Sequence, residues 1–469
     1  MTDATFPSGS APRPSGGIFS RNALYFALVA NILPSIPYFA LSVFVCPVRI
    51  LPILLYFLLA VVGLYLNVFV LSFLAVVVAF VDVVLVVSGI FNLSPVLILD
   101  SVKYSASLDL FSFLGYAGFA GAVALSVALY VHLLVKNRQT FKRVSLYPAI
   151  LSCFVIVGLD AYFNLSPQVL FASSLQENTE FSSAIKQAAL DVPAPLDNEQ
   201  DVLIVMMEGM GAFADPANQK VLWEIFETPA IGSAFTVSTG TSPYIGSTTS
   251  AESRELCGKW GDYTDYLTDP AYDCLPARYK QAGYETAAFH AFWGAFFDRT
   301  DWFPRIGFEK LNFQEQLKND LNVPEGKTCG LTFKGLCDLD VADAVEAYLV
   351  QHDDKPKFAY WLTLNTHLPL EAGAATPRLG CETGGPFDDW TVCTMTEMWM
   401  DVLHRVKEIA LNPSLQGTRI LVVGDHHPPV WTRQGRKQFD AGKIAWLHLE
   451  PKAGARKQMM TAASPRLGN

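Results

Sequence analysis

The chain has 469 residues, of which 51% are hydrophobic, and its formal net charge is −10. Its mean hydropathy of +0.27 is too high for an ordinary soluble protein. The sequence pI near 5.3 and the lack of a basic stripe argue against nucleic acid as a partner.

Five apolar segments in the first third of the chain are long enough to cross a bilayer, which takes about 20 apolar residues. They are predicted at 24–45, 51–67, 68–89, 113–135 and 144–163, and the boundary between the second and third is the least marked. A cleavable signal peptide has one short apolar core, so these segments are interpreted as retained spans.

The basic residues predict the orientation of these spans, because cytoplasmic loops carry an excess of Lys and Arg. The loop "KNRQTFKR" between the fourth and fifth spans is strongly basic, and the N-terminal tail carries Arg13 and Arg21. Five spans with a cytoplasmic N-terminus place everything after Phe163 outside. The expected location is a bacterial inner (cell) membrane, crossed several times, with the C-terminal part periplasmic or extracellular.

Two features of the membrane half carry open alternatives. Asp82 lies inside the third span, where a carboxylate is costly, and it is either a functional group or an acid packed between helices. The external loop 101–115 is moderately amphipathic, so we expect it to lie in the membrane interface, where it could help admit a lipid.

The composition of successive regions predicts the domain organisation. Residues 1–22 form a cytoplasmic tail, 23–165 a transmembrane domain, 166–200 a polar linker, 201–450 a globular domain and 451–469 a C-terminal tail. In the globular domain, short apolar β-rich runs alternate with helix-like segments. The predicted fold is therefore an α-helical transmembrane bundle followed by an α/β domain whose mostly parallel sheet is flanked by helices.

Six of the eight cysteines lie in the predicted external domain, in close sequence pairs. The pairs are Cys257 with Cys274, Cys329 with Cys337, and Cys381 with Cys393. Six cysteines allow many connectivities, and pairing by proximity is the simplest. An oxidising compartment would permit three disulfides, whereas a metal site is less favoured because no CxxC spacing occurs.

Four apolar runs of the external domain end in carboxylate or imidazole side chains. "DVLIVMM" stops at Glu208, "YETAAF" at His290, "FAYWLTL" shortly before His367, and "RILVVG" at Asp425 and His426. In open α/β sheets, ligands bind outside the carboxyl ends of the strands. Carboxylates with an imidazole suit Zn²⁺ or Mn²⁺, so these endings predict a metal site at one sheet edge.

The stretch "GSTTSAESRELCG" contains a candidate nucleophile. Thr249 and Glu252 fit a capping box at a helix start, and capping alone would explain the pattern. Thr248, just before the box, would then lie at the positive end of the helix, which favours a phosphoryl group. A bound metal would lower the pKa of its hydroxyl and activate it for attack.

With these residues assembled, the chain resembles the membrane-anchored phospho-alcohol transferases of the alkaline phosphatase/sulfatase superfamily. This group includes lipoteichoic acid synthases, phosphoglycerol transferases acting on periplasmic glucans, and phosphoethanolamine transferases acting on lipid A. The resemblance covers nearly the whole chain. It implies Glu208, Thr248, Asp425 and His426 as ligands of one divalent metal ion, Zn²⁺ or Mn²⁺, Thr248 as the nucleophile, and His367 as a contact of the phosphoryl group.

A second set of residues in the resemblance concerns the substrate. "FHAFWGAFFDR" resembles the stretch of lipoteichoic acid synthases that surrounds glycerol phosphate, which implies phosphate contacts from His290 and Arg299. Phe297 stands where those enzymes have Trp, so an aromatic wall remains but the indole donor is lost. Packing is the alternative for the aromatic residues here. His427 is expected to assist the leaving group or contact phosphate, unless the two prolines after it simply fix a turn.

The resemblance implies transfer of a phospho-alcohol head group from a membrane phospholipid, through a covalent phospho-threonine, to an envelope glycan or lipid. Phosphoglycerol is favoured because Cys257, followed by Gly, matches the glucan enzymes. The alternatives are a phosphoethanolamine transferase acting on lipid A or another lipopolysaccharide sugar, and a metal-dependent phosphodiesterase. A sulfatase proper is disfavoured, since no Cys-x-Pro-x-Arg motif occupies the nucleophile position. The protein is expected to be a monomer.

Overall fold

The computed structural model describes residues 17–91, 93–110, 112–165, 180–193, 200–268, 272–320, 327–351, 355–383, 385–415 and 417–452. Most of the predicted N-terminal tail, nearly all of the C-terminal tail and much of the linker lie outside the described residues. The chain forms two compact units. Met1–Val87 with Gly115–Val169 is called the helical unit, and Ser88–Leu114 with Leu170–Asn469 the α/β unit.

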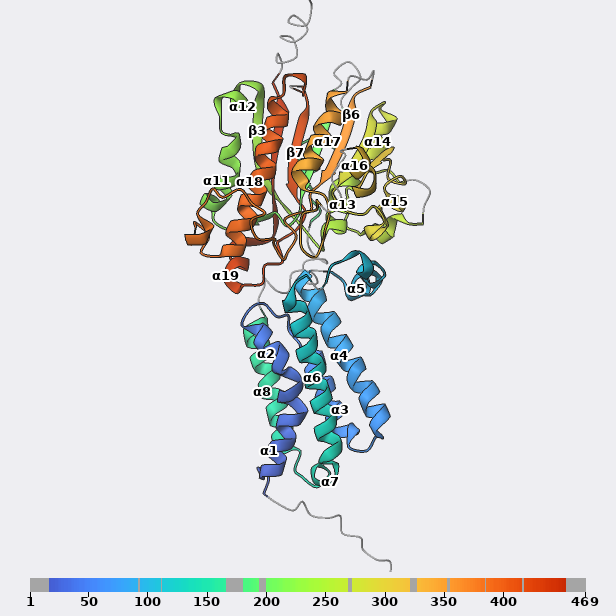
Figure 1. Cartoon of the computed structure of the whole chain (residues 1–469), viewed down its shortest axis with the longest axis vertical. Coiled ribbons are helices and arrows are strands. Elements are labelled where there is room, and N and C mark those ends of the chain that lie inside the picture. The colour runs from blue at the N-terminus through green and yellow to red at the C-terminus, as the bar shows by residue number, and fades with distance from the viewer. Residues whose placement is uncertain are drawn as a thin grey trace, which may run out of the picture. The chain divides into compact units, whose positions relative to one another are not determined.

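Apolar helices make up the helical unit (Figure 1). They are α1 (Arg21–Ala27), η1 (Leu28–Ile32), η2 (Leu33–Ser35), α2 (Ile36–Ser42), α3 (Ile50–Gly63), α4 (Val68–Phe91, whose last turn belongs to the α/β unit), α6 (Leu114–Lys136), α7 (Arg138–Phe141) and α8 (Tyr147–Asn164). The first four run on as one apolar segment, Arg21–Ser42. Pro34 and Pro37 lack the N–H of a regular helix, which explains the π and 3-10 turns beside them.

Four of these segments are long and apolar enough to cross a membrane, namely Arg21–Ser42, Val68–Phe91, Leu114–Lys136 and Tyr147–Asn164. The prediction of about five spans is confirmed in outline. The second predicted span is the shorter apolar helix α3, with 14 residues. The boundary before the third span falls at Asn67, whose side chain accepts a hydrogen bond from Val70 N (2.9 Å) at the start of α4.

The carboxylate of Asp82 is paired with Arg49 inside the helical unit. The Arg49 Nε and Nη2 atoms lie 2.8 and 2.6 Å from the two Asp82 oxygens, and both side chains are buried. The guanidinium also lies over the Tyr38 ring, 3.4 Å from its centroid. A bidentate Arg pair satisfies a carboxylate that would otherwise be costly in an apolar bundle, which favours the packed alternative for Asp82.

One mixed sheet forms the centre of the α/β unit, with eight strands among the described residues. The strands are β1 (Val202–Met207), β2 (Gly211–Phe213), β3 (Phe235–Pro243), β4 (Glu285–His290), β5 (Lys310–Asn312), β6 (Lys357–Leu362), β7 (Arg419–Gly424) and β8 (Phe439–Pro451). The order is β2-β8-β7-β1-β6-β4-β5, and β3 pairs with β8. Strands β7, β1, β6, β4 and β5 are parallel, as predicted, and β8, β3 and β2 add antiparallel pairs at one side.

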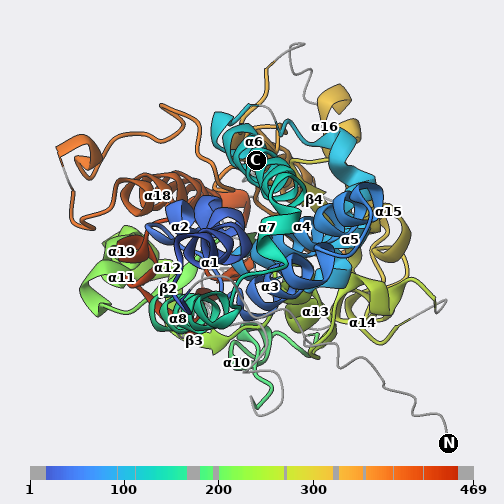
Figure 2. The ribbon, with the colours of Figure 1, turned by 90° about the horizontal axis from the view of Figure 1, so that it is seen from below.

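Helices cover both faces of the sheet, and Figure 2 shows α18 and α13 on opposite sides. One face carries α11 (Pro216–Trp223), α12 (Pro229–Ala234), α17 (Asp338–Val350) and α18 (Trp390–Leu411). The other carries α10 (Ala184–Gln187), α13 (Thr248–Cys257), α14 (Leu275–Gln281) and α15 (Arg299–Trp302). Short helices α16 (Gln314–Asp320) and α19 (Arg433–Arg436) complete the unit.

The central strand β1 shows why the sequence selects this layered fold. Its alternate residues Leu203, Val205 and Met207 pack in the α17/α18 core. Val202, Ile204 and Met206 pack in the α13/α14 core. A strand buried on both faces reads as a continuous apolar run, as "VLIVMM" does.

All three disulfides predicted from proximity are present. They join Cys257 to Cys274, Cys329 to Cys337, and Cys381 to Cys393. Cys46 and Cys153, in the helical unit, are free and buried. Each bridge closes a short local loop, so the disulfides fix loops rather than distant parts of the sheet.

Candidate active site

The ends of β1 and β7 bring two carboxylates side by side. Met207 and Gly424 are partners in the parallel register, so Glu208 and Asp425 are the next residue on each strand. The Gly209 amide donates to Asp425 Oδ1 (2.7 Å), which ties the two strand ends together. His426 follows Asp425 directly and donates its amide to the same oxygen (2.6 Å).

Thr248 reaches this edge from the first turn of α13. Gly246, two residues earlier, has φ +77°, and a Cβ there would lie 2.3 Å from Ser250 Oγ. The turn into the helix therefore requires glycine. Ser247 is the N-cap, and its buried hydroxyl makes no hydrogen bond among the described residues.

The predicted capping box at Thr249 and Glu252 is wrong, because the N-cap is Ser247, two residues earlier, and the helix begins at Thr248. The Thr249 and Ser250 hydroxyls both donate to Asp262 Oδ2, each at 2.9 Å. Glu252 instead pairs with Arg299. Since the Thr249 hydroxyl is committed to Asp262, Thr248 is the threonine of the two that faces the metal-ligand candidates.

The Thr248 hydroxyl lies among the three candidate ligands. Thr248 Oγ1 is 2.9 Å from Asp425 Oδ2, 3.3 Å from Glu208 Oε2 and 3.4 Å from His426 Nε2. His426 Nε2 is itself 3.3 Å from Asp425 Oδ2 and 3.6 Å from Glu208 Oε1. One ligand atom from each of Glu208, Asp425 and His426 falls within 4.8 Å of the others. The structure thus brings together the four residues predicted as metal ligands.

The electrostatics of this group fit a divalent cation. Glu208 and Asp425 are both buried, and burial together with the Asp425 charge raises the pKa of Glu208 well above its ordinary value. A cation held between the two carboxylates would relieve this repulsion. The Nδ1 atom of His426 lies 3.0 Å from the His427 carbonyl oxygen, an acceptor that holds the ring proton on Nδ1 and leaves the Nε2 lone pair facing the carboxylates. Two carboxylates, an imidazole and a hydroxyl suit Zn²⁺ or Mn²⁺.

The candidate metal ligands are held in place by several residues that no sequence motif identifies. The Glu208 backbone is fixed at both its polar atoms, since its amide donates to Thr363 Oγ1 and its carbonyl accepts from Thr366 Oγ1 and Trp399 Nε1. On the β7 side, the buried Arg254 of α13 donates to the carbonyl oxygens of Gly424 (3.0 Å) and Asp425 (3.1 Å).

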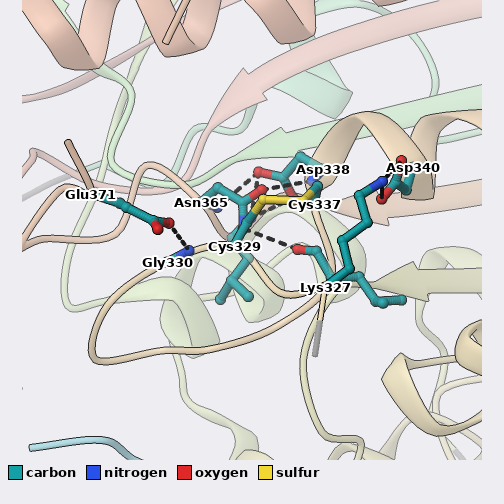
Figure 3. Close-up of a disulfide and its surroundings, with 10 residues drawn as sticks. Lys327, Cys329, Gly330, Cys337, Asp338, Asp340, Asn365 and Glu371 are labelled. Carbon is teal, nitrogen blue, oxygen red and sulfur yellow. Dashed lines mark hydrogen bonds and ion pairs between the residues drawn. A yellow bond between two sulfur atoms is a disulfide. The ribbon is translucent and has the colours of Figure 1, made fainter. Parts of the chain in front are cut away.

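His367 lies two residues after Asn365, which Figure 3 shows beside the Cys329–Cys337 disulfide and Asp338. Asp338, directly after Cys337, accepts hydrogen bonds from the Leu364 and Asn365 amides, and burial raises its pKa to about 7. Phe333, within the disulfide loop, packs on the His367 ring with centroids 3.8 Å apart. Desolvation lowers the pKa of His367 to about 4, which keeps its ring neutral.

Arg299 and His290 are buried beside the group, but the Arg299 side chain is already engaged. Its Nε and Nη2 atoms bind the two Glu252 oxygens at 3.0 and 3.1 Å, and Nη1 donates to the Phe296 carbonyl. His290 Nδ1 lies 3.1 Å from the Leu362 carbonyl oxygen, and burial lowers the pKa of His290 to about 3, which keeps the ring neutral. This geometry favours a positioning role for Arg299 over the predicted direct phosphate contact.

Phe297 and His427 also lie in packed surroundings. The Phe297 ring packs against Phe296, Tyr104 and Tyr263, and its backbone has φ +53°. The His427 ring is buried, with Nδ1 2.8 Å from the Pro428 carbonyl oxygen and Nε2 3.4 Å from that of Arg436. Contacts with backbone carbonyls favour a structural role for His427 over the predicted phosphate contact.

Part of the chain matches a known protein family. Residues 200–391 match the model of the Sulfatase family. That range includes Glu208, Thr248, His290, Arg299 and His367, and it ends before β7. No curated protein matches the chain significantly.

Solved structures with some similarity include three membrane-associated or envelope enzymes. The lipoteichoic acid synthase LtaP from Listeria monocytogenes is 15% identical, with a TM-score of 0.41 over 54% of this chain and 65% of its own. The Streptococcus pyogenes phosphoglycerol transferase GacH, in complex with sn-glycerol-1-phosphate, is 15% identical, with a TM-score of 0.38 over 56% of this chain and 71% of its own. The integral membrane lipooligosaccharide phosphoethanolamine transferase EptA from Neisseria meningitidis is 13% identical, with a TM-score of 0.36 over 74% of this chain and 63% of its own.

The chain spans less than two thirds of the length of LtaP and of EptA. These structural similarities are too low to assign a function, whereas the match to the family model rests on the sequence itself. Over residues 200–391, which include Glu208 and Thr248, this chain is therefore similar to the Sulfatase family.

Proposed function

We propose that this protein transfers a phospho-alcohol head group, with phosphoglycerol favoured, from a membrane phospholipid to an envelope glycan or lipid. One observation carries the proposal: the Thr248 hydroxyl lies within 3.4 Å of Glu208, Asp425 and His426 together. A hydroxyl among two buried carboxylates and an imidazole is the arrangement of a metal-activated nucleophile.

The reaction has two displacements at phosphorus. Thr248 Oγ1 attacks the donor phosphodiester, its proton passes toward Asp425 Oδ2, and the bond from phosphorus to the diacylglycerol oxygen breaks as that oxygen takes up a proton. An acceptor hydroxyl then attacks the phosphorus, the bond from phosphorus to Thr248 Oγ1 breaks, and the acceptor's proton passes to that oxygen to regenerate the Thr248 hydroxyl. A divalent ion held by Glu208, Asp425 and His426 would supply the positive charge that lowers the pKa of the threonine hydroxyl.

Other groups of the site support the same chemistry. Thr248 is the first residue of α13, and the backbone amides of a helix N-terminus suit the oxygens of a transferred phosphoryl group. A neutral His367 can donate or accept a hydrogen bond there without adding charge. Through their hold on α13, Glu252 and Arg299 would keep Thr248 in register with the ligands.

The location follows from the same reasoning. We propose that the protein lies in a bacterial inner (cell) membrane as a monomer, with residues 201–450 acting as a catalytic domain on the periplasmic or extracellular side. The basic loop 136–143 supports this orientation. Three disulfides support an oxidising compartment for the domain.

A phosphoethanolamine transferase is the second candidate. The observation in its favour is the set of three local disulfides, because local disulfides are also common in phosphoethanolamine transferases. Hydrolysis, with water as the acceptor, remains the alternative outcome of the second displacement.

The test incubates the full-length protein in lipid nanodiscs with head-group-labelled phosphatidylglycerol or phosphatidylethanolamine, followed by peptide mapping. We expect a phosphoglycerol adduct on Thr248, loss of the adduct and of turnover in Thr248→Ala, and retention of both in the matched control Thr249→Val. Chelation should abolish turnover, and Zn²⁺ or Mn²⁺ should restore it.

Three results would change the proposal. An ethanolamine adduct would replace the donor, and intact turnover in Thr248→Ala would remove Thr248 as the nucleophile. Free glycerol phosphate released at the same rate with and without acceptor glycans would identify a hydrolase.

A further inference from the structure

The segment between α4 and α6 belongs to the α/β unit although both of its ends lead into apolar helices. It folds into α5 (Pro95–Ser101) and η3 (Val102–Ser107). α5 begins four residues after α4 ends at Phe91, and α6 begins at Leu114. The segment is therefore joined at each end to a helix that is long and apolar enough to cross a membrane.

One side of the segment binds the loops near the candidate active site. Tyr104 is buried and packs on Phe296 and Phe297, with ring centroids 5.2 and 5.7 Å apart. Asp100 accepts a hydrogen bond from the Tyr263 hydroxyl, and Lys103 pairs with Asp298 at 2.8 Å.

The attachment continues beyond η3. The Asp109 amide donates to the Thr332 carbonyl at 2.9 Å, and the Asp109 carboxylate pairs with Lys334 at 2.5 Å. Both partners lie in the loop closed by the Cys329–Cys337 disulfide. Asp100, Lys103, Tyr104 and Asp109 thus hold the segment to the rest of the α/β unit.

The segment also carries apolar side chains that nothing in the described structure covers. Val96, Leu99 and Val102, three residues apart, are 74%, 49% and 60% exposed. This spacing places them on one helical face, which we call the Val96–Val102 stripe. Four other residues of the segment, Asp100, Lys103, Tyr104 and Asp109, contact the rest of the α/β unit. An apolar stripe left exposed beside them indicates an apolar partner.

We propose that the Val96–Val102 stripe inserts into the outer surface of the lipid bilayer and holds the rim of the active site against it. Continuity with the spans identifies the occupant as lipid, since the segment leaves α4 and enters α6, whose first residue Leu114 is 83% exposed and apolar. Amphipathic helices of this kind lie in the interface with the apolar face in the acyl-chain boundary. The Phe297–Asp298 turn then stays beside the lipid head groups, which extends the proposed function by giving the donor a route to the site.

The direct test measures contact with lipid and needs no activity. Full-length Leu99→Cys, labelled with an environment-sensitive fluorophore, is placed in phosphatidylcholine proteoliposomes with and without lipids that carry a quencher on the acyl chain. Ala230→Cys, at an exposed position of α12, is the matched control, and unlabelled wild type gives the background from its buried cysteines.

We expect acyl-chain quenching at Leu99 at least about twofold stronger than at Ala230, with emission shifted to the blue. Val102→Cys should behave like Leu99→Cys, which guards against a variant that fails to fold. Equal quenching at Leu99, Val102 and Ala230 would overturn the proposal and leave a protein partner or a second copy as the cover of the stripe.

A second measurement separates this inference from the proposed function. Leu99→Asp should slow turnover of phosphatidylglycerol in bilayers severalfold while leaving hydrolysis of a water-soluble chromogenic phosphodiester unchanged, and Leu99→Met should preserve both. Equal loss on both donors would overturn the link to the lipid donor. A wild-type protein inactive on both donors would refute the proposed function. The quenching result would still show whether the Val96–Val102 stripe inserts into the bilayer.

Discussion

Arg299 and Glu252 form a buried ion pair whose two charges depend on each other. Their side chains are 2% and 0% exposed, and Tyr360 Oη donates a further hydrogen bond to Glu252 Oε1 at 3.2 Å. The geometry is bidentate, as in strong guanidinium–carboxylate recognition. An arginine in such a pair acts on the site by holding α13 in place.

Removing one member of this pair should cost more than removing both. Arg299→Met or Glu252→Gln alone leaves a buried charge uncompensated, with an expected loss of about 3–5 kcal/mol in the free energy of unfolding. The double variant should recover most of that loss. Thermal unfolding of the detergent-solubilised full chain, followed by tryptophan fluorescence, measures the effect. An Arg299→Met protein as stable as wild type but inactive would instead assign Arg299 to phosphate binding.

At the residue scale, candidate site residues can be predicted from the sequence where a side chain able to bind a metal directly follows a predicted strand. Glu208, Asp425 and His426 could be selected because a polar ligand type directly follows an apolar run. Glu252 was misread because [ST]-x-x-E also describes a capping box, and its partner Arg299 lies 47 residues away. A local pattern carries no information about such a distant partner.

At the scale of elements, α13 links the proposed nucleophile to the candidate metal ligands. Its first residue is Thr248, and Arg254, about two turns later, binds the carbonyl oxygens at the end of β7. Arg254 Nε also binds Glu255 at 2.6 Å, and Glu255 accepts the Ala184 and Ile185 amides ahead of β1. One helix therefore holds both the end of β7 and the segment that contains Ala184 and Ile185.

Changing Arg254 should weaken metal binding, although the residue does not contact the metal position. Groups that orient metal ligands typically contribute about 10–100-fold to affinity. We expect a loss of that size in Arg254→Met, partly restored in Arg254→Lys, in a chelator competition with Zn²⁺ on the metal-free protein. Arg278→Met is the matched control, since Arg278 is an exposed arginine on α14 paired with Asp273. Unchanged Zn²⁺ affinity in Arg254→Met would reduce Arg254 to a packing residue.

The parallel strands were predictable from their continuous apolar runs, and the edge strands were not. β3 pairs along β8 from Phe235 to Pro243, yet most of its side chains are exposed and its sequence "FTVSTGTSP" is small and polar. Backbone pairing with β8 determines the position of this strand, because its own side chains bury little apolar surface. The helical spans were placed to within a few residues for the opposite reason, since length and hydropathy suffice to define them.

For the whole molecule, the basic residues predict which side of the membrane each part occupies. Gln139 is exposed in the basic loop, and Ala230 is exposed on α12 of the α/β unit. In intact spheroplasts, a membrane-impermeant maleimide should label Ala230→Cys at once, whereas Gln139→Cys should react only after permeabilisation. Labelling of both without permeabilisation, or the reverse order, would invert the proposed orientation.

The strand order of the sheet also determines when the site can exist. β1 opens the α/β domain, but its neighbour β7 comes near the end of the chain, and Thr248 and Asp425 are 177 residues apart. If the domain is exported and binds an ion as proposed, the first carboxylate emerges long before its partners, and a segment that has only partly crossed the membrane cannot hold that ion. On this proposal metal loading is among the last steps of maturation, and the ion comes from the compartment in which the domain completes its folding.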